Sequence, residues 1–310
     1  MAVTTIPWGD GSGDNIYLTY PSASGDQTVQ VSSDANAGST DRTKTITFTA
    51  SHHGTTDAKT LTVVQEGVPE QYIVFKDPAV GAICAAQWGD GVGIKPSQAA
   101  AVPFSTNVQK NAFWNAFSSI KTTITSFDEL VYFTNVNRVN AGAFKDNTVL
   151  TSIDLSNIQQ IYYEAFRGCT ALAMELDIPK LSYWDYNTFY GSGVTKVKSL
   201  GNITTMGSYG QFQNCASLVS AIVPATVTTM NRYQFYGCTN LQYVIMLPTT
   251  PPTVTNTNFR NTGSCVVYVP YSADHSILSA YQTTWGANSG ANTYDVPRLA
   301  ELNPDGTIPT

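Results

Sequence analysis

The chain has 310 residues, enough for two or three domains that each bury a core. Charged residues make up only 12% of it and hydrophobic residues 42%, so Thr, Ser, Asn, Gln and Tyr must form much of the surface, as in extracellular or virion β-proteins and unlike cytosolic enzymes. The net charge of −6 offers no basic patch for nucleic acid, and no apolar run approaches the ~20 residues that span a bilayer.

The first 68 residues alternate apolar and polar side chains, as an all-β domain does. They predict strands at 15–20, 27–31, 44–49 and 59–64, separated by turns of Gly, Asp, Asn and Ser. Short strands at this spacing are typical of a small β-sandwich. The phrases Asp41–Thr49 and Lys59–Gly67, the second closing on Val-x-Gln-x-Gly, resemble the BACON domain. That resemblance implies an immunoglobulin-like module common in proteins of gut bacteria and their phages, with a proposed role in carbohydrate binding.

Two loops of this part contain residue types that bind metal ions. Asp10–Asn15 places oxygen atoms at every second residue, like half of a calcium loop, but it lacks the distal glutamate. Trp8–Gly13 recurs as Trp88–Gly93 without the later aspartate, which favours a glycine turn pinned by a tryptophan over a shared calcium site. His52 and His53 have no partner nearby in the sequence, so we expect them in a solvated loop.

Residues 69–135 join the N-terminal part to the repeats that follow. Residues 71–75 predict a strand and residues 127–133 resemble a degenerate first coil. Residues 105–120 predict a helix that Ser105 caps. Its apolar stripe comprises Val108, Ala112, Phe113, Ala116, Phe117 and Ile120. Because a solenoid needs a cap over its open apolar end, we expect this helix to cover the repeats.

From Val136 to Pro270 the chain repeats with a period of about 23 residues. Phenylalanines 22 to 24 positions apart mark six copies: Phe144, Phe166, Phe189, Phe212, Phe235 and Phe259. Apolar residues precede most of them by eight and five positions, but in the fourth copy Ile203 and Met206 are set back by one extra residue. Such self-similarity predicts a solenoid in which each coil carries two short strands and the phenylalanines form an interior column.

The pattern Phe-x-x-Cys-x-x-Leu, followed by an apolar strand and a proline, occurs at 166–172, 212–218 and 235–241. It resembles the BspA-like leucine-rich repeats (LRR_5 type) of bacterial surface antigens, and the segment 251–285 resembles that family's closing segment. Copies one, three and six depart from the pattern, since Asn147 and Ser192 replace the cysteine and Cys265 is displaced.

These parts together predict a mainly β chain. We expect an N-terminal immunoglobulin-like β-sandwich in residues 1–68, a linker and short helical cap in 69–135, and a leucine-rich-repeat solenoid with its closing segment in 136–302. The tail, 303–310, is expected to be extended or disordered.

Three cysteines occupy the same position in their copies: Cys169, Cys215 and Cys238. Side chains in one column of a solenoid point in parallel, which favours free, buried thiols. A disulfide between Cys215 and Cys238, on adjacent coils, is the alternative. No histidine accompanies them, so no zinc site is expected.

No catalytic constellation appears in the sequence. The three histidines are far from any nucleophile, and no nucleotide-binding or hydrolase motif occurs. Asp128 and Glu129 are adjacent in an expected strand and would face opposite ways. We therefore expect a protein that is not an enzyme, without cofactor or metal.

Five aromatic residues form the candidate ligand site. Tyr163, Tyr186 and Tyr209 each stand three residues before a repeat phenylalanine and should align on neighbouring coils, with Tyr183 and Trp184 beside them. Exposed stacked aromatics with Asn and Thr neighbours suit sugars, which have apolar faces and hydroxyl groups. A tyrosine column that only supports coil packing is the alternative.

Two settings fit these features. The first is a phage virion, in which the chain is a head or tail fibre or capsid decoration protein that displays the solenoid to a host glycan or surface protein. The sequence starts at a methionine without an export signal, lipobox or sorting tail, which favours this setting. The repeats alone favour the second, an adhesin on a bacterial cell surface. A carbohydrate-processing accessory module is a more distant third.

The expected partners follow from these settings. They are other virion proteins or cell-surface structures, a glycan, and further copies of the chain in a homo-oligomer that gains from multivalency. Nucleic acid and membrane insertion are not expected.

Overall fold

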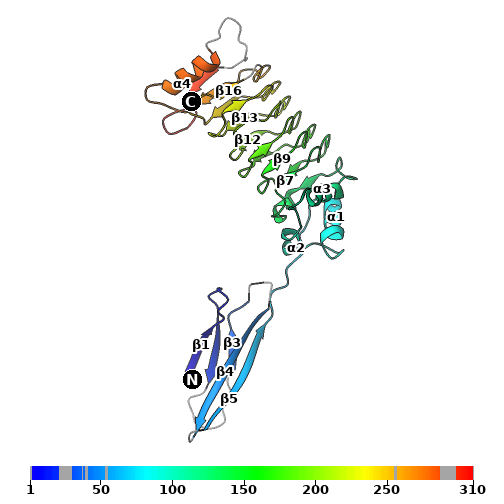
Figure 1. Cartoon of the computed structure of the whole chain (residues 1–310), viewed down its shortest axis with the longest axis vertical. Helices are drawn as coiled ribbons and strands as arrows, with labels where there is room; N and C mark the ends of the chain where they lie inside the picture. The colour runs from blue at the N-terminus through cyan, green and yellow to red at the C-terminus, as the bar shows by residue number, and fades with distance from the viewer. Residues whose placement is uncertain are drawn as a thin grey trace. The chain divides into compact units, whose positions relative to one another are not determined.

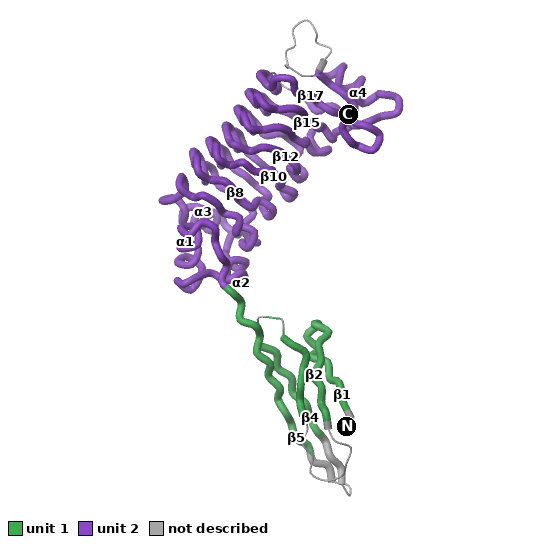
Figure 2. Tube along the Cα trace, turned by 180° about the vertical axis from the view of Figure 1, so that it is seen from behind, with its two compact units in different colours: residues 1–71 green, residues 72–310 purple. Residues whose placement is uncertain are grey.

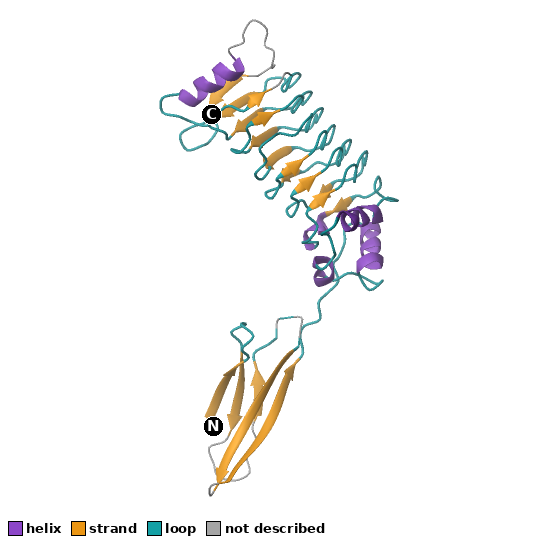
Figure 3. Cartoon of the chain, in the orientation of Figure 1, coloured by secondary structure: helices purple, strands orange, loops and turns teal. Residues whose placement is uncertain are grey.

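The computed structural model describes residues 2–20, 30–36, 38, 41–52, 55–254, 257–286 and 298–309. The chain divides into two compact units, residues 1–71 and 72–310 (Figure 2). It is mainly β with few helices (Figure 3). Among the described helices, none is long and apolar enough to cross a membrane.

The first unit contains two small antiparallel sheets. One has the order β1-β2-β3, formed by β1 (Ala2–Pro7), β2 (Asn15–Tyr20) and β3 (Gln30–Ser33). The other is a hairpin of β4 (Arg42–His52) and β5 (Thr55–Gln65) (Figure 1). Both sheets contribute to one core of buried side chains: Trp8, Ile16, Leu18 and Ile46. The strands predicted from the sequence are present and β1 precedes them, while residues 27–29 and His53 lie outside the described residues.

The half calcium loop of the first unit lies against the side chain of Arg42. Nη1 of Arg42 lies 3.4 Å from the Asp10 carboxylate and 2.8 Å from that of Asp14, and its guanidinium covers the Trp8 ring at 4.8 Å. The described residues contain no group of three or more His, Cys, Asp or Glu side chains that could hold a metal ion. Arg42 therefore supplies the positive charge at these carboxylates.

The glycine-turn interpretation of the duplicated motif is confirmed. In the first copy Asp10 Oδ1 accepts from the backbone N of Ser12 at 3.0 Å. In the second, Asp90 Oδ1 accepts from the backbone N of Val92 and of Gly93, each at 3.0 Å. An aspartate thus closes the same kind of local turn in both places.

Three helices precede the solenoid: α1 (Pro78–Trp88), α2 (Pro96–Ala100) and α3 (Asn107–Ala116). The strand predicted at residues 71–75 is wrong, since only Ile73 of that segment joins Ile94 by a backbone hydrogen bond, at 2.9 Å. The predicted helix is shorter than expected and is capped by Thr106, whose side chain accepts from the N of Gln109. Ser105 instead donates to the Gln109 side chain.

The predicted apolar stripe of α3 is also wrong in part, because its aromatic residues decide which face is buried. Val108 is 79% exposed, whereas Phe113, Trp114 and Phe117 are buried. The Trp114 ring packs edge-on against Phe144, the first phenylalanine of the repeats, at 5.6 Å. The helix therefore covers the open end of the solenoid, as expected.

The solenoid makes about six turns over residues 126–268 (Figure 1). Its main face is a parallel sheet in the order β10-β12-β13-β15-β17-β18. These strands are β10 (Glu175–Asp177), β12 (Lys196–Ser199), β13 (Ser220–Val223), β15 (Tyr243–Met246), β17 (Val266–Val269) and β18 (Arg298–Glu301).

Shorter parallel strands form the second face of the coils. They are β7 (Arg138–Val139), β9 (Gln160–Ile161) and β11 (Tyr183–Trp184) in one sheet, and β14 (Thr229–Met230) and β16 (Thr253–Val254) in another. The degenerate first coil is confirmed, since β6 (Ser126–Phe127) pairs with β8 (Ser152–Ile153). Asp128 and Glu129 lie in a 3₁₀ helix, Asp128–Tyr132, and not in the expected strand.

The repeat phenylalanines form a continuous interior column, as predicted. Consecutive ring centroids from Phe144 to Phe259 are 5.0–5.8 Å apart, and the planes of neighbouring rings differ by 4–19°. All six rings are almost completely buried.

Beside this column runs a column of free thiols, as expected. Each thiol donates to the backbone carbonyl of a phenylalanine in the preceding coil: Cys169 to Phe144, Cys215 to Phe189 and Cys238 to Phe212, at 2.9–3.0 Å. In the first copy Asn147 takes the same place and donates to the carbonyls of Lys121 and Ile124. The departure in the first copy therefore keeps a side-chain donor on backbone carbonyls.

The C-terminal segment closes the last coil. Helix α4 (Ser276–Tyr281) continues into a π-helical turn, Gln282–Gly286. Tyr281 and Trp285 donate to the carbonyls of Pro248 and Pro252, each at 2.8 Å. The first residues of the tail do not form the expected extended arm. Asn303 and Thr307 instead close a hydrogen-bonded turn.

Candidate binding site

The fourth coil contains a local bulge that creates a pocket. Four residues separate Trp184 from Phe189 in the third coil, but five separate Met206 from Phe212 in the fourth. The chain accommodates the extra residue through Gly207, at φ 72°. A Cβ on this glycine would lie 1.8 Å from Nε2 of Gln211. Only glycine therefore fits here without a shift of a neighbouring group.

The buried Gln211 side chain joins the bulge to the third coil. Its Nε2 donates to the carbonyl of Asp185, and its Oε1 accepts from the N of Thr188 at 3.2 Å. These bonds keep the two coils at a fixed separation.

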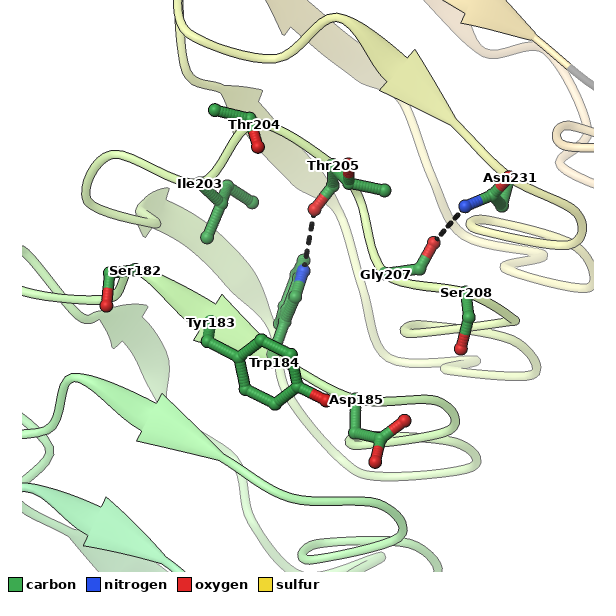
Figure 4. Close-up of a pocket in the computed structure, with 10 residues that line it drawn as sticks. All are labelled: Ser182, Tyr183, Trp184, Asp185, Ile203, Thr204, Thr205, Gly207, Ser208 and Asn231. Atoms are coloured by element: carbon green, nitrogen blue, oxygen red, sulfur yellow. Dashed lines mark hydrogen bonds between the residues drawn. The ribbon is translucent and has the colours of Figure 1, made fainter.

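The bulge interrupts the short-strand face of the solenoid. Strand β11 pairs with β9 on one side, but among the described residues no strand pairs with it on the other. Pairing resumes through a single bridge between Thr205 and Thr229. Across the gap, Nε1 of Trp184 donates to the carbonyl of Thr205 at 3.1 Å (Figure 4).

A pocket of about 260 Å³ lies at this gap. Its lining, drawn in Figure 4, comprises Ser182, Tyr183, Trp184, Asp185, Ile203, Thr204, Thr205, Gly207, Ser208 and Asn231. Four hydroxyl-bearing Ser and Thr side chains, one carboxylate and one amide thus surround two aromatic rings. Asp185 is held in place, since its Oδ1 accepts from the N of Tyr186 at 2.8 Å.

Two of the predicted ligand residues belong to this pocket. Tyr183 is 45% exposed and its ring lies 5.7 Å from that of Tyr162. Trp184 is 4% exposed and packs edge-on against Phe212. Tyr183 therefore offers an open ring surface, whereas Trp184 forms part of the pocket wall.

The other three predicted residues form a column that is interrupted. The rings of Tyr163 and Tyr186 stack at 5.2 Å with an angle of 7°. Tyr209 instead contacts Tyr233, at 5.0 Å and 59°. Among the described ring pairs, Tyr186 and Tyr209 do not meet, although both stand three residues before their phenylalanine. Tyr163, Tyr186 and Tyr209 are all exposed.

The sequence argument missed several residues of this surface. Asn231, whose amide donates to the carbonyl of Gly207 at 2.7 Å, belongs to the fifth coil and lines the pocket. Tyr233 stands two positions before its phenylalanine, not three, and so fell outside the search pattern. The one available signal was the setback of Ile203 and Met206.

The chemistry of the pocket suits hydrogen bonding. Burial, followed by the negative charge of Asp185 and the neighbouring Tyr162, raises the pKa of Tyr183, so its hydroxyl remains a donor at neutral pH. Asp185 is the one carboxylate among the lining residues. The pocket thus combines an exposed aromatic face with donors and acceptors.

Comparison with known protein families accounts for the repeats. Residues 137–266 match the family described as BspA type leucine rich repeat region, in six copies. Residues 137–266 are a BspA-type leucine-rich repeat region. This repeat region contains all six phenylalanines of the interior column. Neither the curated proteins nor the solved structures include a significant match to the chain.

Proposed function

We propose that this leucine-rich repeat protein is a non-enzymatic attachment protein whose solenoid binds a glycan or a surface protein of a host cell. The observation that carries the proposal is the interruption between the third and fourth coils, which leaves the exposed Tyr183 beside a polar pocket. Most ligand sites are concave, largely apolar, and carry a few fixed polar groups.

A glycan is the ligand that suits this pocket best. The apolar face of a sugar ring stacks on the exposed surface of Tyr183, and its hydroxyls reach Asp185 and Thr204. The volume of about 260 Å³ lies just below the ~300–1,000 Å³ of drug-sized pockets, which fits the end of a glycan chain.

Two tyrosine pairs, of which only Tyr233 is half-buried, extend the binding surface along the coils. Tyr163 with Tyr186 and Tyr209 with Tyr233 lie on either side of the interruption. Their alternative role is to support coil packing. Because single sugar contacts are weak, we propose that the chain works as a homo-oligomer in which several sites act together.

The setting has two candidates, which the repeat region fits equally. One is a phage virion, where the chain would be a head or tail fibre or decoration protein. The other is the surface of a bacterium, where it would be an adhesin. The low charge content of 12% suits either place. Detection of the chain in purified virions by mass spectrometry supports the first; its detection in a bacterial envelope fraction supports the second.

The first unit is proposed to be an immunoglobulin-like, BACON-like sandwich that docks the protein on its carrier. Two sheets that share the core of Trp8, Ile16, Leu18 and Ile46 support this assignment.

A direct test compares two tyrosine variants on a glycan array of bacterial surface polysaccharides. Tyr183→Ala removes the open ring of the pocket and should abolish binding. Tyr271→Ala removes a tyrosine of similar exposure, 41%, elsewhere on the solenoid unit and should leave binding intact. Equal binding by both variants would reject this pocket as the glycan site.

A further inference from the structure

A second pocket, of about 400 Å³, lies where helix α3 meets the first repeat coil. Its lining comprises Asn107, Asn111, Arg138, Asn140, Ala141 and Tyr162. The residues come from two elements, α3 and the segment around β7, together with Tyr162 of the next coil. It shares no lining residue with the pocket at the fourth coil.

Arg138 carries a buried charge in this pocket. It is 7% exposed, and its guanidinium lies over the Tyr162 ring at 4.9 Å. No described carboxylate pairs with it; its Nε, Nη1 and Nη2 donate to the amide oxygens of Asn140, Asn107 and Asn111 at 2.9, 3.1 and 3.2 Å. Burial of an ion is costly unless an opposite charge compensates it. Three neutral amides stand where aspartates of the same shape would neutralise the arginine.

The same hydrogen bonds leave mainly hydrogen-bond donors available to a ligand in the pocket. Because each amide oxygen already accepts from Arg138, the asparagines present their NH₂ groups to a ligand. The NH₂ group of Asn140 donates in part to Asn111 at 2.8 Å, whereas those of Asn107 and Asn111 have no acceptor among the described residues. A guanidinium has five N–H groups, and the three bonds above leave one on each terminal nitrogen.

We infer that this pocket binds the carboxylate of an acidic saccharide such as a hexuronic acid. A carboxylate matches the planar guanidinium of Arg138 and supplies the missing negative charge. The amide donors of Asn107 and Asn111 then serve the ring oxygen and hydroxyls of the sugar. The exposed Ala141 leaves the rim open for the rest of the chain.

The sharpest variant is Asn111→Asp. Its Oδ1 keeps both hydrogen bonds that Asn111 accepts, from Arg138 and from Asn140. The new carboxylate neutralises Arg138 inside the pocket, so a bound anion would be repelled while the fold is retained. Tyr271→Ala, at an exposed tyrosine that lines neither pocket, is the matched variant that should leave this site unchanged.

Isothermal titration calorimetry of the full chain with sodium glucuronate, glucose and inorganic phosphate tests the inference. The wild type and Tyr271→Ala should bind glucuronate and not glucose, and Asn111→Asp should lose at least about tenfold in affinity while it melts at or above the wild-type temperature. Absence of glucuronate binding, or equal binding by Asn111→Asp, would overturn the inference. Binding of phosphate but not glucuronate would overturn the saccharide assignment. Because the proposed function is tested with Tyr183→Ala, its failure is distinguishable from failure here.

Discussion

The indole nitrogen of Trp184 donates to the carbonyl oxygen of Thr205 at 3.1 Å, and this bond bridges two coils whose short strands do not pair. Elsewhere on this face, backbone bonds join neighbouring coils, as between β7 and β9. A single side-chain hydrogen bond leaves space between the two coils that paired backbone strands would fill. The candidate pocket exists because the ladder is broken here.

The phenylalanine column should dominate the stability of the solenoid. Phe212→Ala removes a ring that stacks between Phe189 and Phe235 at 5.8 Å on both sides, and should lower the free energy of unfolding by about 3–5 kcal/mol. Urea denaturation followed by circular dichroism measures the change. The control Val108→Ala, at a side chain that is 79% exposed, should cost less than about 0.5 kcal/mol. A wild-type unfolding curve for Phe212→Ala would contradict the column.

The bulge should depend on glycine more strongly than an ordinary turn does. Gly207→Ala places an alanine in a left-handed backbone conformation and also makes its Cβ collide with Gln211. Gly191→Ala, at φ 64°, has the same backbone strain, but its Cβ meets no atom within 4 Å. The left-handed conformation costs a residue with a Cβ about 1–2 kcal/mol of stability. Thermal melts should therefore rank wild type, Gly191→Ala and Gly207→Ala in falling order. Equal melting temperatures of the two variants would show that Gln211 is free to move.

The buried thiols should make the protein sensitive to alkali. Burial raises the pKa of Cys215 to about 11, above the ~8.5 of an unfolded cysteine. Below ~8.5 both states keep the proton and stability is unaffected; above it only the unfolded chain releases the proton, so stability falls as pH rises toward 11. The slope for one thiol is about 1.4 kcal/mol per pH unit.

Cys215→Ser isolates this effect, because Ser192 already occupies the equivalent position in the third copy. The serine can still donate to the carbonyl of Phe189, and it does not ionise in this range. Urea denaturation at pH 8 and pH 10 should show a smaller loss of stability for the variant than for the wild type. Parallel losses would mean that the Cys215 thiol is not protected in the folded state.

The repeat architecture was predictable because its signal is redundant. Six phenylalanines at nearly constant spacing fix the column, and the thiol position follows from the same register, as Cys169 and Cys215 show. The cap was harder to predict. Helix α1, Pro78–Trp88, is apolar at almost every position and therefore has no amphipathic period to detect. In α3 the large rings of Phe113 and Trp114 decided the buried face over the i, i+4 pattern that begins at Val108.

The candidate site was only partly predictable. The exposed tyrosines followed from their register, but the sequence could not tell whether the extra residue of the fourth copy would loop out or break the strand pairing. That outcome depends on Gly207 and the buried Gln211, whose side chain binds the neighbouring coil. Arg138 gave no sequence signal, because its asparagine partners on α3 are distant in the chain.

Deletion of Ser208 tests the central claim most directly. The deletion restores four residues between Met206 and Phe212, the number found in the third coil, and gives Met206 and Tyr209 the spacing of Trp184 and Tyr186. The strands of the third and fourth coils can then pair and close the pocket. On the array of bacterial surface polysaccharides, we expect the wild type to bind and the deletion variant to lose at least about tenfold in binding while it melts at or above the wild-type temperature. A folded deletion variant that binds as the wild type does, or a wild type that binds no glycan, would contradict the account.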